Sequence, residues 1–235
     1  MLSRLICTLF FVLFSSEVGS QGMNVSKELI KEINTFKLKK PIYRTKSQSL
    51  KYLEGVIEKI KPSAELLCME ITSNRKNCKW ELEIISGNEF NAYASGDNKI
   101  SFYTGLVRGI YYEEELAFVV AHEIGHHIAN HLNESKRSTT IGAILGAAIA
   151  LDSGLPPGDA SQIGAYIGRF SFSRRQEIEA DTISKKILIN SGYDIKKARI
   201  GLIRLTRTGL SKTNSAFLDS HPSGPERVLI FDKIQ

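Results

Sequence analysis

The chain has 235 residues, 42% of them hydrophobic, and a formal net charge of +6. This length supports a substantial hydrophobic core but is short for two typical domains, which favours one folded unit. Lysine and arginine are scattered along the sequence, apart from a cluster at 37–40. The excess charge therefore indicates solubility or weak attraction to an anionic membrane, and nothing more specific.

Residues 1–20 have the pattern of a secretory signal peptide. Arg4 supplies the positive charge, residues 5–14 are apolar, and residues 18–20 offer small side chains for cleavage. The apolar run is too short to span a bilayer, and Cys7 lies within it, away from any cleavage boundary, which argues against a lipoprotein. We therefore expect an exported chain, periplasmic or envelope-associated in a bacterium. That compartment excludes nucleic acid as a partner.

After removal of the leader, we expect an N-terminal helical region at 21–65 that packs on a larger domain at 66–235. Two cysteines remain, Cys68 and Cys78, beside a predicted strand. In an exported protein this arrangement favours a disulfide where the strand region begins. The alternative is a pair of reduced, buried thiols.

The strand region follows these cysteines. Hydrophobic residues alternate with charged ones over residues 80–84, which predicts a strand. A second strand is expected to end at Ala94, where residues 95–98 form a turn into an apolar run at 100–103. We therefore expect a small antiparallel sheet that contains at least this hairpin.

A His-Glu-Ile-Gly-His motif that begins at His122 carries the strongest functional signal. Glutamates at 113–115 and apolar residues at helical spacing over 116–128 predict that the motif lies on a helix. Residues four apart share a helix face, so the rings of His122 and His126 can converge on one tetrahedral zinc ion. Glu123, rotated to the side, can reach a water bound to that ion. The motif therefore predicts a zinc hydrolase.

The alternative for this motif is an amphipathic helix with surface histidines. Residues 116–121 are wholly apolar, which favours a buried helix, where an unpaired histidine would be costly. Gly125 in mid-helix lowers stability by roughly 1 kcal/mol and indicates close approach of another element. His127 and His131 form a second pair with the same spacing, rotated about 100° around the helix axis from the first pair. We expect these two histidines to face solvent near the end of the helix. Leu132 replaces the third histidine of a metzincin, which excludes that class.

A third zinc ligand is expected in the acidic sequence that begins at Glu177. If this segment is helical, as the apolar spacing from Ile183 to Leu188 indicates, Glu177 and Asp181 share a face and Glu179 points away. One of the two carboxylates can bind zinc, and the other can accept the free N–H of a ligand histidine. Spacing alone leaves the two roles open, and an ordinary charged helix is the alternative.

Several motifs together resemble the M48 family of zinc metallopeptidases, in the compact exported branch related to bacterial periplasmic proteases and mitochondrial Oma-type enzymes. They occur in the family's order over residues 66–230. The matching pieces are His122–His126, Phe172-Ser173-Arg174 before Glu177–Asp181, His221-Pro222 followed by Arg227, and Asn91–Ala94 leading to Ile100 and Thr104-Gly105-Leu106. The resemblance implies an α+β domain of gluzincin type, mainly helical, with a small antiparallel sheet beside the zinc helix.

The resemblance also implies roles for individual residues. Glu177 would be the third ligand of one Zn²⁺ per chain, and Asp181 would orient a ligand histidine. By itself His221 is only a loop residue before a proline. In the family it would face the zinc and either stabilise the oxyanion or occupy the position of the water in a resting state. Arg227 would hold that segment through an acidic partner, and Glu123 would be the catalytic base.

Family members receive the substrate as a strand added to an edge strand. This implies that Asn91, Ala92 and Tyr93 bind extended polypeptide, so that cleavage depends on accessible backbone more than on sequence. Residues 95–97 depart from the usual proline-glycine-glycine tip, which leaves the shape of the tip open.

Residues 141–151 and 163–168 are rich in small and aliphatic side chains, and each segment has a Gly-x-x-x-Gly spacing. Each is too short to cross about 30 Å of hydrocarbon. The spacing favours a packed pair of helices between the two zinc motifs. The alternative is peripheral contact with a membrane, and a mobile pair would act as a lid over the cleft.

The sequence thus predicts an exported zinc endopeptidase that cleaves misfolded or membrane-associated proteins of the envelope. The metal would polarise the scissile carbonyl, and Glu123 would take the proton of the attacking water and pass it to the leaving amine. The alternative is a binding module, a holdase that uses the same zinc cleft with little turnover. Substrate, cleavage specificity and oligomeric state are left open.

Overall fold

The computed structural model describes residues 24–37, 40, 42–72, 78–95, 98–134, 172–210, 221 and 224–234. Two predictions lie outside the described residues. They are the signal peptide at 1–20 and the packed helices at 141–151 and 163–168, which therefore stay predictions.

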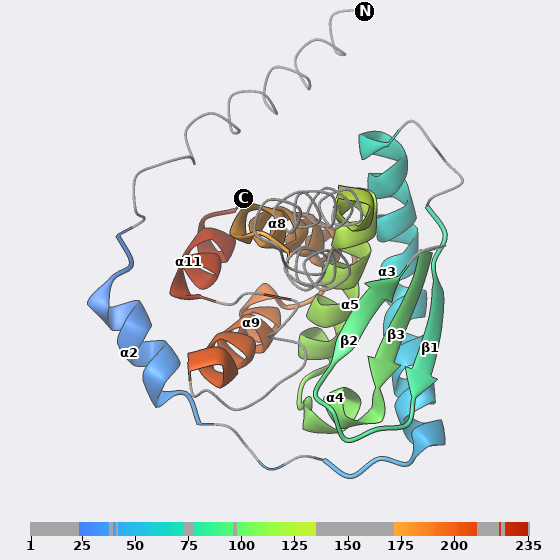
Figure 1. The fold of residues 1–235 in the computed structure, drawn as a ribbon, viewed down its shortest axis with the longest axis horizontal. Coiled ribbons are helices and arrows are strands. Elements are labelled where there is room, and N and C mark those ends of the chain that lie inside the picture. Colours follow the sequence, from blue (N-terminus) through green and yellow to red (C-terminus); the bar gives the residue numbers. More distant parts are fainter. Residues whose placement is uncertain are drawn as a thin grey trace, which may run out of the picture.

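Within this part the molecule is mainly helical. The helices are α2 (Lys27–Thr35), α3 (Lys46–Ile71), α4 (Thr104–Gly109), α5 (Glu113–Ile128), α8 (Arg174–Asn190), α9 (Ile195–Leu210) and α11 (Pro225–Lys233), and the strands are β1 (Glu81–Ile85), β2 (Ala92–Ser95) and β3 (Lys99–Tyr103). Helix α5 lies between the small sheet and the helices α8 and α9, while α11 and α2 lie farther from the sheet (Figure 1). This confirms the expected α+β class.

Strand β3 is the central strand of the sheet. It runs parallel to β1, with Leu82 opposite Ile100, and antiparallel to β2, with Ala94 opposite Ile100. The expected hairpin of β2 and β3 is present, but the sheet is mixed, where an antiparallel sheet was predicted. The alternation over 80–84 predicts a strand without fixing the direction of its partner, and here the partner is the returning strand of the hairpin. Strand β2 is left as an edge beside α5.

Helix α5 is buried on nearly all sides, because α3, α8, α9 and β2 surround it. The apolar stripe inferred from the sequence is therefore only part of its buried surface. At the first turn, the Glu115 carboxylate accepts a hydrogen bond from the backbone N–H of Tyr112 at 3.3 Å and one from Arg204 at 2.8 Å. These contacts fix the start of the helix that carries the histidine motif in the interior.

The described residues of the N-terminal part form α2 and α3. Helix α3 packs on α5 and runs without interruption through residue 65, so it continues across the expected limit between 21–65 and 66–235. Helix α2 is tied to α9 and α11 by Arg199, which contacts Glu32 at 2.5 Å and Asp232 at 2.6 Å. Among the described residues, no helix has both the length and the hydropathy that a membrane span requires.

Cys68, near the end of α3, and Cys78, shortly before β1, lie side by side. Their Sγ atoms are 2.05 Å apart, which is the bonding distance of a disulfide. Both cysteines are buried. The pair would join the long N-terminal helix to the sheet.

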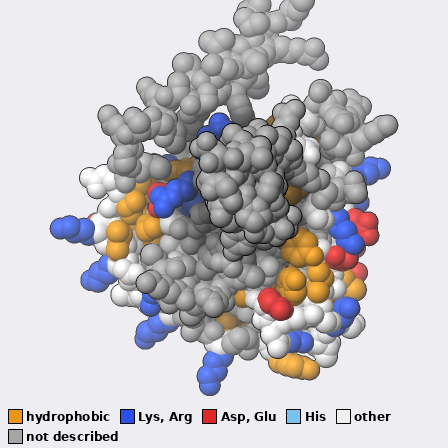
Figure 2. Space-filling model, in the orientation of Figure 1, with side chains coloured by type: hydrophobic (Ala, Val, Ile, Leu, Met, Phe, Trp, Pro, Cys, Tyr) orange, Lys and Arg blue, Asp and Glu red, His pale blue; other side chains and the backbone are white. Residues whose placement is uncertain are grey.

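The surface carries its positive charge in a dispersed way. In the view of Figure 2, the visible Lys and Arg side chains of the described residues lie around the periphery and do not form a single patch. This agrees with the scattered positions of Lys and Arg in the sequence.

Candidate metal centre

The two histidines of the motif project from one face of α5. The Nε2 atoms of His122 and His126 are 3.0 Å apart, and both side chains are completely buried. The two ring planes are nearly perpendicular, at 84°, and the short distance between the Nε2 atoms brings the two nitrogens to one place. This is the convergence that the four-residue spacing predicts.

Gly125 lets helix α8 come close enough to complete the site. A Cβ atom at Gly125 would lie 2.8 Å from the backbone oxygen of Ala180, nearer than real Cβ atoms come to a backbone atom. This confirms the expectation that Gly125 marks a close approach. Glu177 and Asp181, which lie on α8 with Ala180, contact the histidines through their carboxylates.

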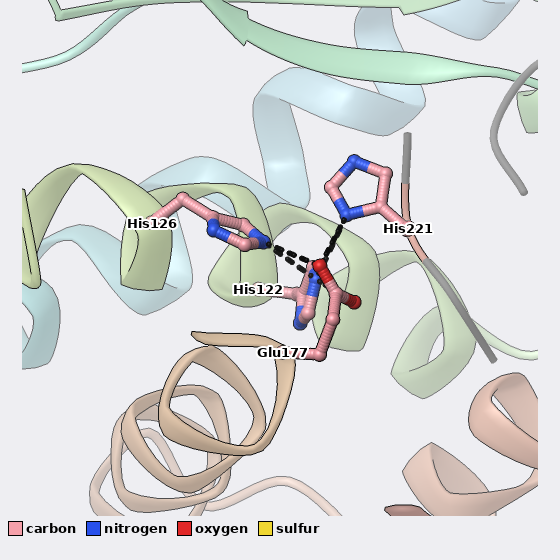
Figure 3. A group of neighbouring side chains, drawn as sticks. All are labelled: His122, His126, Glu177 and His221. Atoms are coloured by element: carbon pink, nitrogen blue, oxygen red, sulfur yellow. Dashed lines mark hydrogen bonds and ion pairs between the residues drawn. The ribbon is translucent and has the colours of Figure 1, made fainter. Parts of the chain in front are cut away.

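Glu177 lies against both histidines. Its carboxylate oxygens are 3.5 Å from Nε2 of His122 and 3.4 Å from Nε2 of His126. His221, which is buried, adds a fourth group, because its Nδ1 lies 3.1 Å from the Glu177 carboxylate. The four side chains point toward one another in Figure 3, and one ligand atom from each lies within 4.8 Å of the others.

The size of this cluster suits a metal ion. Ligand bonds of about 2.0–2.1 Å in a tetrahedron place neighbouring ligand atoms about 3.3 Å apart. The measured separations of 3.0 to 3.5 Å between His122, His126 and Glu177 match that edge. Buried nitrogens this close to each other and to a carboxylate need a cation or a shared proton between them, and imidazole with carboxylate is a donor set for a divalent metal.

Asp181 takes a position behind His122. Its Oδ1 lies 2.9 Å from Nδ1 of His122, the nitrogen that faces away from Glu177. Arg227 binds the same carboxylate through two nitrogens, each at 2.8 Å, and also contacts Glu177 at 2.6 Å. The structure therefore separates the two carboxylates that spacing left open: Glu177 lies among the candidate ligands and Asp181 lies behind a ligand.

Electrostatics keep both carboxylates ionised. Burial by itself raises the pKa of Glu177, but the positive charge of Arg227 and the contact with His221 hold that pKa well below its usual range. Burial also opposes ionisation of Asp181, and Arg227 again outweighs it and lowers the pKa. Burial lowers the pKa of His126 far below its usual value. Two carboxylates and a neutral imidazole are the protonation states that metal binding requires.

The ring of His122 behaves differently before a metal binds. Burial lowers its pKa, but hydrogen bonds to Asp181 and Glu177 outweigh burial and raise the pKa to about 9. A metal ion would replace the proton on the Nε2 side, while the Nδ1–H stays on Asp181. Metal binding would therefore release a proton from this site at neutral pH.

Glu123 lies next to this cluster, with its carboxylate completely buried. Neither of its oxygens receives a hydrogen bond from the described residues, and Oε1 is 3.5 Å from Nε2 of His221. Buried carboxylate oxygens without donors are rare because they lose their hydration without compensation. A metal-bound water would supply the missing donor, so the position of Glu123 also fits a metal site.

The two outer histidines do not both face solvent as predicted. His127 is half-buried, and burial lowers its pKa to about 4. His131 is buried, with its Nδ1 2.9 Å from Nδ1 of His126. The prediction for His131 was wrong because it assumed a continuous helix. The backbone turns at Asn130, where φ is 61°, and this turn brings His131 back to the ligand.

The sequence could have indicated this turn, because residue 130 is an asparagine. Asparagine is one of the few residues that adopts the left-handed conformation readily and often ends helices in this way. Phe172 was named in a motif of the family resemblance, but no role in the site was predicted for it. Its ring stacks on His126 with centroids 3.8 Å apart, and it precedes the cap of α8 at Ser173.

The predicted strand residues lie on the sheet side of α5. Ala92 and Tyr93 belong to the edge strand β2, and the carbonyl of Asn91 accepts a hydrogen bond from the Tyr103 N–H at 3.0 Å. In an antiparallel pair the outward-facing backbone groups alternate, so those of Ala92 and Ala94 point away from β3.

A central helix with two histidines and a glutamate, joined by a carboxylate from a second helix, defines the gluzincin type of metallopeptidase domain. A family model for peptidase family M48 matches residues 58–234. The chain therefore belongs to peptidase family M48.

Individual relatives support the same assignment. The chain is 32% identical to mitochondrial metalloendopeptidase OMA1 of Arabidopsis thaliana over 156 residues, which are 66% of this chain and 32% of that protein. It is 30% identical to the beta-barrel assembly-enhancing protease of Escherichia coli (strain K12) over 140 residues, 54% of this chain and 29% of that protein. Metalloprotease LoiP of the same strain is 27% identical over 149 residues, with 62% and 58% covered. The chain thus spans about a third of the length of the first two.

Proposed function

We propose that this chain is a zinc-dependent endopeptidase with one Zn²⁺ held by His122, His126 and Glu177. The observation that carries this proposal is the buried Glu123 carboxylate, which lies beside the four-residue cluster with no donor among the described residues. Two imidazoles and one carboxylate are the ligand set of hydrolytic zinc enzymes. When bound, zinc would lower the pKa of a water and polarise a carbonyl oxygen.

The residues of the chain would do the remaining work. Glu123 would accept the proton of the water at its free oxygens and pass it to the leaving amine. Asp181 would keep the proton on Nδ1 of His122, so that Nε2 is free to bind, and Arg227 would hold both Asp181 and Glu177 in place.

His221 would be a regulator of this centre. Its Nδ1 lies 3.4 Å from Nε2 of His122 and 3.1 Å from Glu177, which is the position of a fourth ligand. In this arrangement the side chain would take the place of the water and would have to move before hydrolysis. The same ring, once displaced, would be near enough to stabilise the oxyanion.

The substrate would be an extended polypeptide paired with the edge of β2. The backbone groups of Ala92 and Ala94 point toward that edge, and β2 packs next to α5. Backbone pairing would give a preference for unfolded segments over particular sequences. We infer exported, misfolded or membrane-associated proteins as substrates, supported by the signal-peptide pattern and by relatives named as a beta-barrel assembly-enhancing protease and a metalloprotease of Escherichia coli.

An envelope location would also suit the two cysteines. Cys68 and Cys78 are at bonding distance, and such a bond persists in an oxidising compartment. Thiol titration of the denatured protein without residues 1–20, which removes Cys7, should show no thiol before reduction and two after it. Peripheral membrane contact through residues 141–168 stays a separate prediction.

Glu123→Gln tests the proposal most directly. The variant should keep its fold and bind zinc, because the ligands are untouched, but casein cleavage should fall about 10²–10⁴-fold with loss of the general base. Glu113→Gln is the matched control, since it makes the same change at an exposed position in the first turn of α5, away from the histidines. Metal content is measured by mass spectrometry and cleavage by gel.

A second variant tests whether the wild type could be inactive because His221 occupies the position of the water. His221→Ala should retain zinc through the other three ligands and open the fourth position. If wild type and His221→Ala both bind zinc and neither cleaves casein, the endopeptidase proposal fails and the holdase alternative is favoured. Undiminished cleavage by Glu123→Gln would refute it equally. Proteins that accumulate on Glu123→Gln in cells would then identify substrates.

A further inference from the structure

The two ligand histidines are supported from behind in different ways. Nδ1 of His122 meets a carboxylate directly, at 2.9 Å from Asp181. Nδ1 of His126 meets a third histidine, at 2.9 Å from Nδ1 of His131. His131 is buried and continues to Glu179, whose Oε2 is 3.4 Å from the His131 Nε2. The metal site is therefore linked to α8 through a second, longer path.

The positions of the protons along this path follow from the contacts. To bind a metal through Nε2, a neutral His126 must carry its proton on Nδ1. That N–H then donates to His131, so Nδ1 of His131 must be the acceptor and its proton must lie on Nε2. The His131 Nε2–H in turn faces the Glu179 carboxylate, which only accepts. Each nitrogen and oxygen along the path from His126 through His131 to Glu179 is therefore either a donor or an acceptor, without conflict.

Phe172 restrains the same ring from another direction. It stacks on His126 with an interplanar angle of 23°. The His126 ring is thus fixed on its face by Phe172 and on its outer nitrogen by His131, while Nε2 points at Glu177. Rotation of the ring would break both contacts at once.

We propose that His131, oriented by Glu179, is a positioning residue that fixes the tautomer and the direction of the His126 ring for metal binding. This inference rests on the proposed zinc function and adds a determinant of metal affinity outside the ligand set. Partners of this kind change metal affinity by about 10–100-fold when removed. Glu179 is half-exposed, so the path ends near the surface of α8.

Two substitutions at His131 separate the hydrogen bond from the packing. His131→Phe keeps a ring of similar size but removes the acceptor, and it should weaken zinc binding about 10–100-fold. His131→Asn places an amide oxygen near the position of Nδ1 and should recover part of that loss. Zinc dissociation constants are measured by competition with a chromophoric chelator. The visible spectrum of the Co²⁺-substituted protein reports the ligand geometry independently of activity.

Glu179 gives a third test that leaves the interior intact. Glu179→Ala removes the acceptor of the His131 Nε2–H and should weaken zinc binding by a smaller factor than His131→Phe. Glu134→Ala is the matched control, because Glu134 also joins this region to α8, through Gln176 at 2.8 Å, without touching a histidine. The control should bind zinc as the wild type does.

The outcomes distinguish this inference from the function beneath it. A weaker zinc constant and an altered cobalt spectrum in His131→Phe, with partial recovery in His131→Asn, would support the positioning role. Equal zinc affinity in wild type, His131→Phe and Glu179→Ala would overturn it, as would equal losses in the Phe and Asn variants. If His131→Phe fails to fold, the Asn and Glu179 variants decide. A wild type that binds no zinc would instead overturn the proposed function itself.

Discussion

Two arginines in this molecule each bridge two carboxylates, one in the interior and one at the surface. Arg227 contacts Glu177 at 2.6 Å and Asp181 at 2.8 Å with a side chain that is 1% exposed. Arg199 contacts Glu32 at 2.5 Å and Asp232 at 2.6 Å with a side chain that is 21% exposed. The chemistry is the same, but only the second group can exchange its partners for water.

The two bridges therefore differ in function because one is buried and the other is in contact with solvent. The interior bridge holds two carboxylates that would otherwise be protonated by burial, one of them a candidate metal ligand. The surface bridge ties α2 to α9 and α11, and water can replace much of that contact. A buried ion network is hard to replace piecemeal, because removal of one member leaves the others desolvated and unpaired.

The largest loss of stability is expected when the interior arginine, Arg227, is replaced. Arg227→Met keeps much of the side-chain volume but removes the guanidinium between Glu177 and Asp181, which leaves the two buried carboxylates to share the charge of the His122 ring. The free energy of unfolding of the metal-free protein should fall by about 3–5 kcal/mol in urea denaturation. A loss below about 1 kcal/mol, the range of exposed pairs, would show that burial does not separate the two bridges.

A smaller effect is expected from a change at the helix contact that brings the network together. Gly125→Ala would place a methyl group 2.8 Å from the Ala180 oxygen, so α8 must shift away from α5. We expect a loss of about 1–3 kcal/mol in unfolding free energy, together with weaker zinc binding.

The matched control for this change is Gly55→Ala. Gly55 is an exposed glycine within α3 that has open space around it. Alanine should raise stability there by up to about 1 kcal/mol, because it favours helix without a clash. If the two variants changed stability in the same direction, close packing would not explain Gly125.

The smallest effect is expected at the surface bridge. Arg199→Met should lower the unfolding free energy by about 1 kcal/mol or less, mainly by loosening α2. The difference from wild type should shrink as salt is added, because exposed charges are screened. Urea denaturation at low and high salt measures this. A difference that persists at high salt would show that Arg199 acts by packing instead of charge.

The parts of the site that lie on single helices could be predicted from the sequence. His122 with His126, and Glu177 with Asp181, are each four residues apart, and that spacing fixes which side chains share a helix face. Gly125 could also be interpreted, because glycine in mid-helix requires a packing reason. Spacing alone could not assign the roles of Glu177 and Asp181, since these depend on how α8 is placed against α5; the family resemblance supplied that assignment.

Other features depended on where the chain turns. His131 was misplaced because a single left-handed residue, Asn130, ends the helical periodicity on which the prediction relied. The direction of β1 relative to β3 was also missed, because side-chain alternation is the same in parallel and antiparallel strands. In both cases the individual helix or strand was predicted correctly, and the error concerned how the chain continues or pairs beyond it.

By itself the sequence determined the helix that carries the histidine motif, the facing acidic helix and the hairpin, because each depends on periodicities of a few residues. Local spacing did not show which carboxylate faces His126 or that His221 joins the cluster from 44 residues beyond Glu177; the family resemblance implied both, and the tertiary structure placed them. Only the tertiary structure decided that His131 supports a ligand. These contacts join segments far apart in the chain. Their geometry follows from packing and burial, which local spacing does not encode.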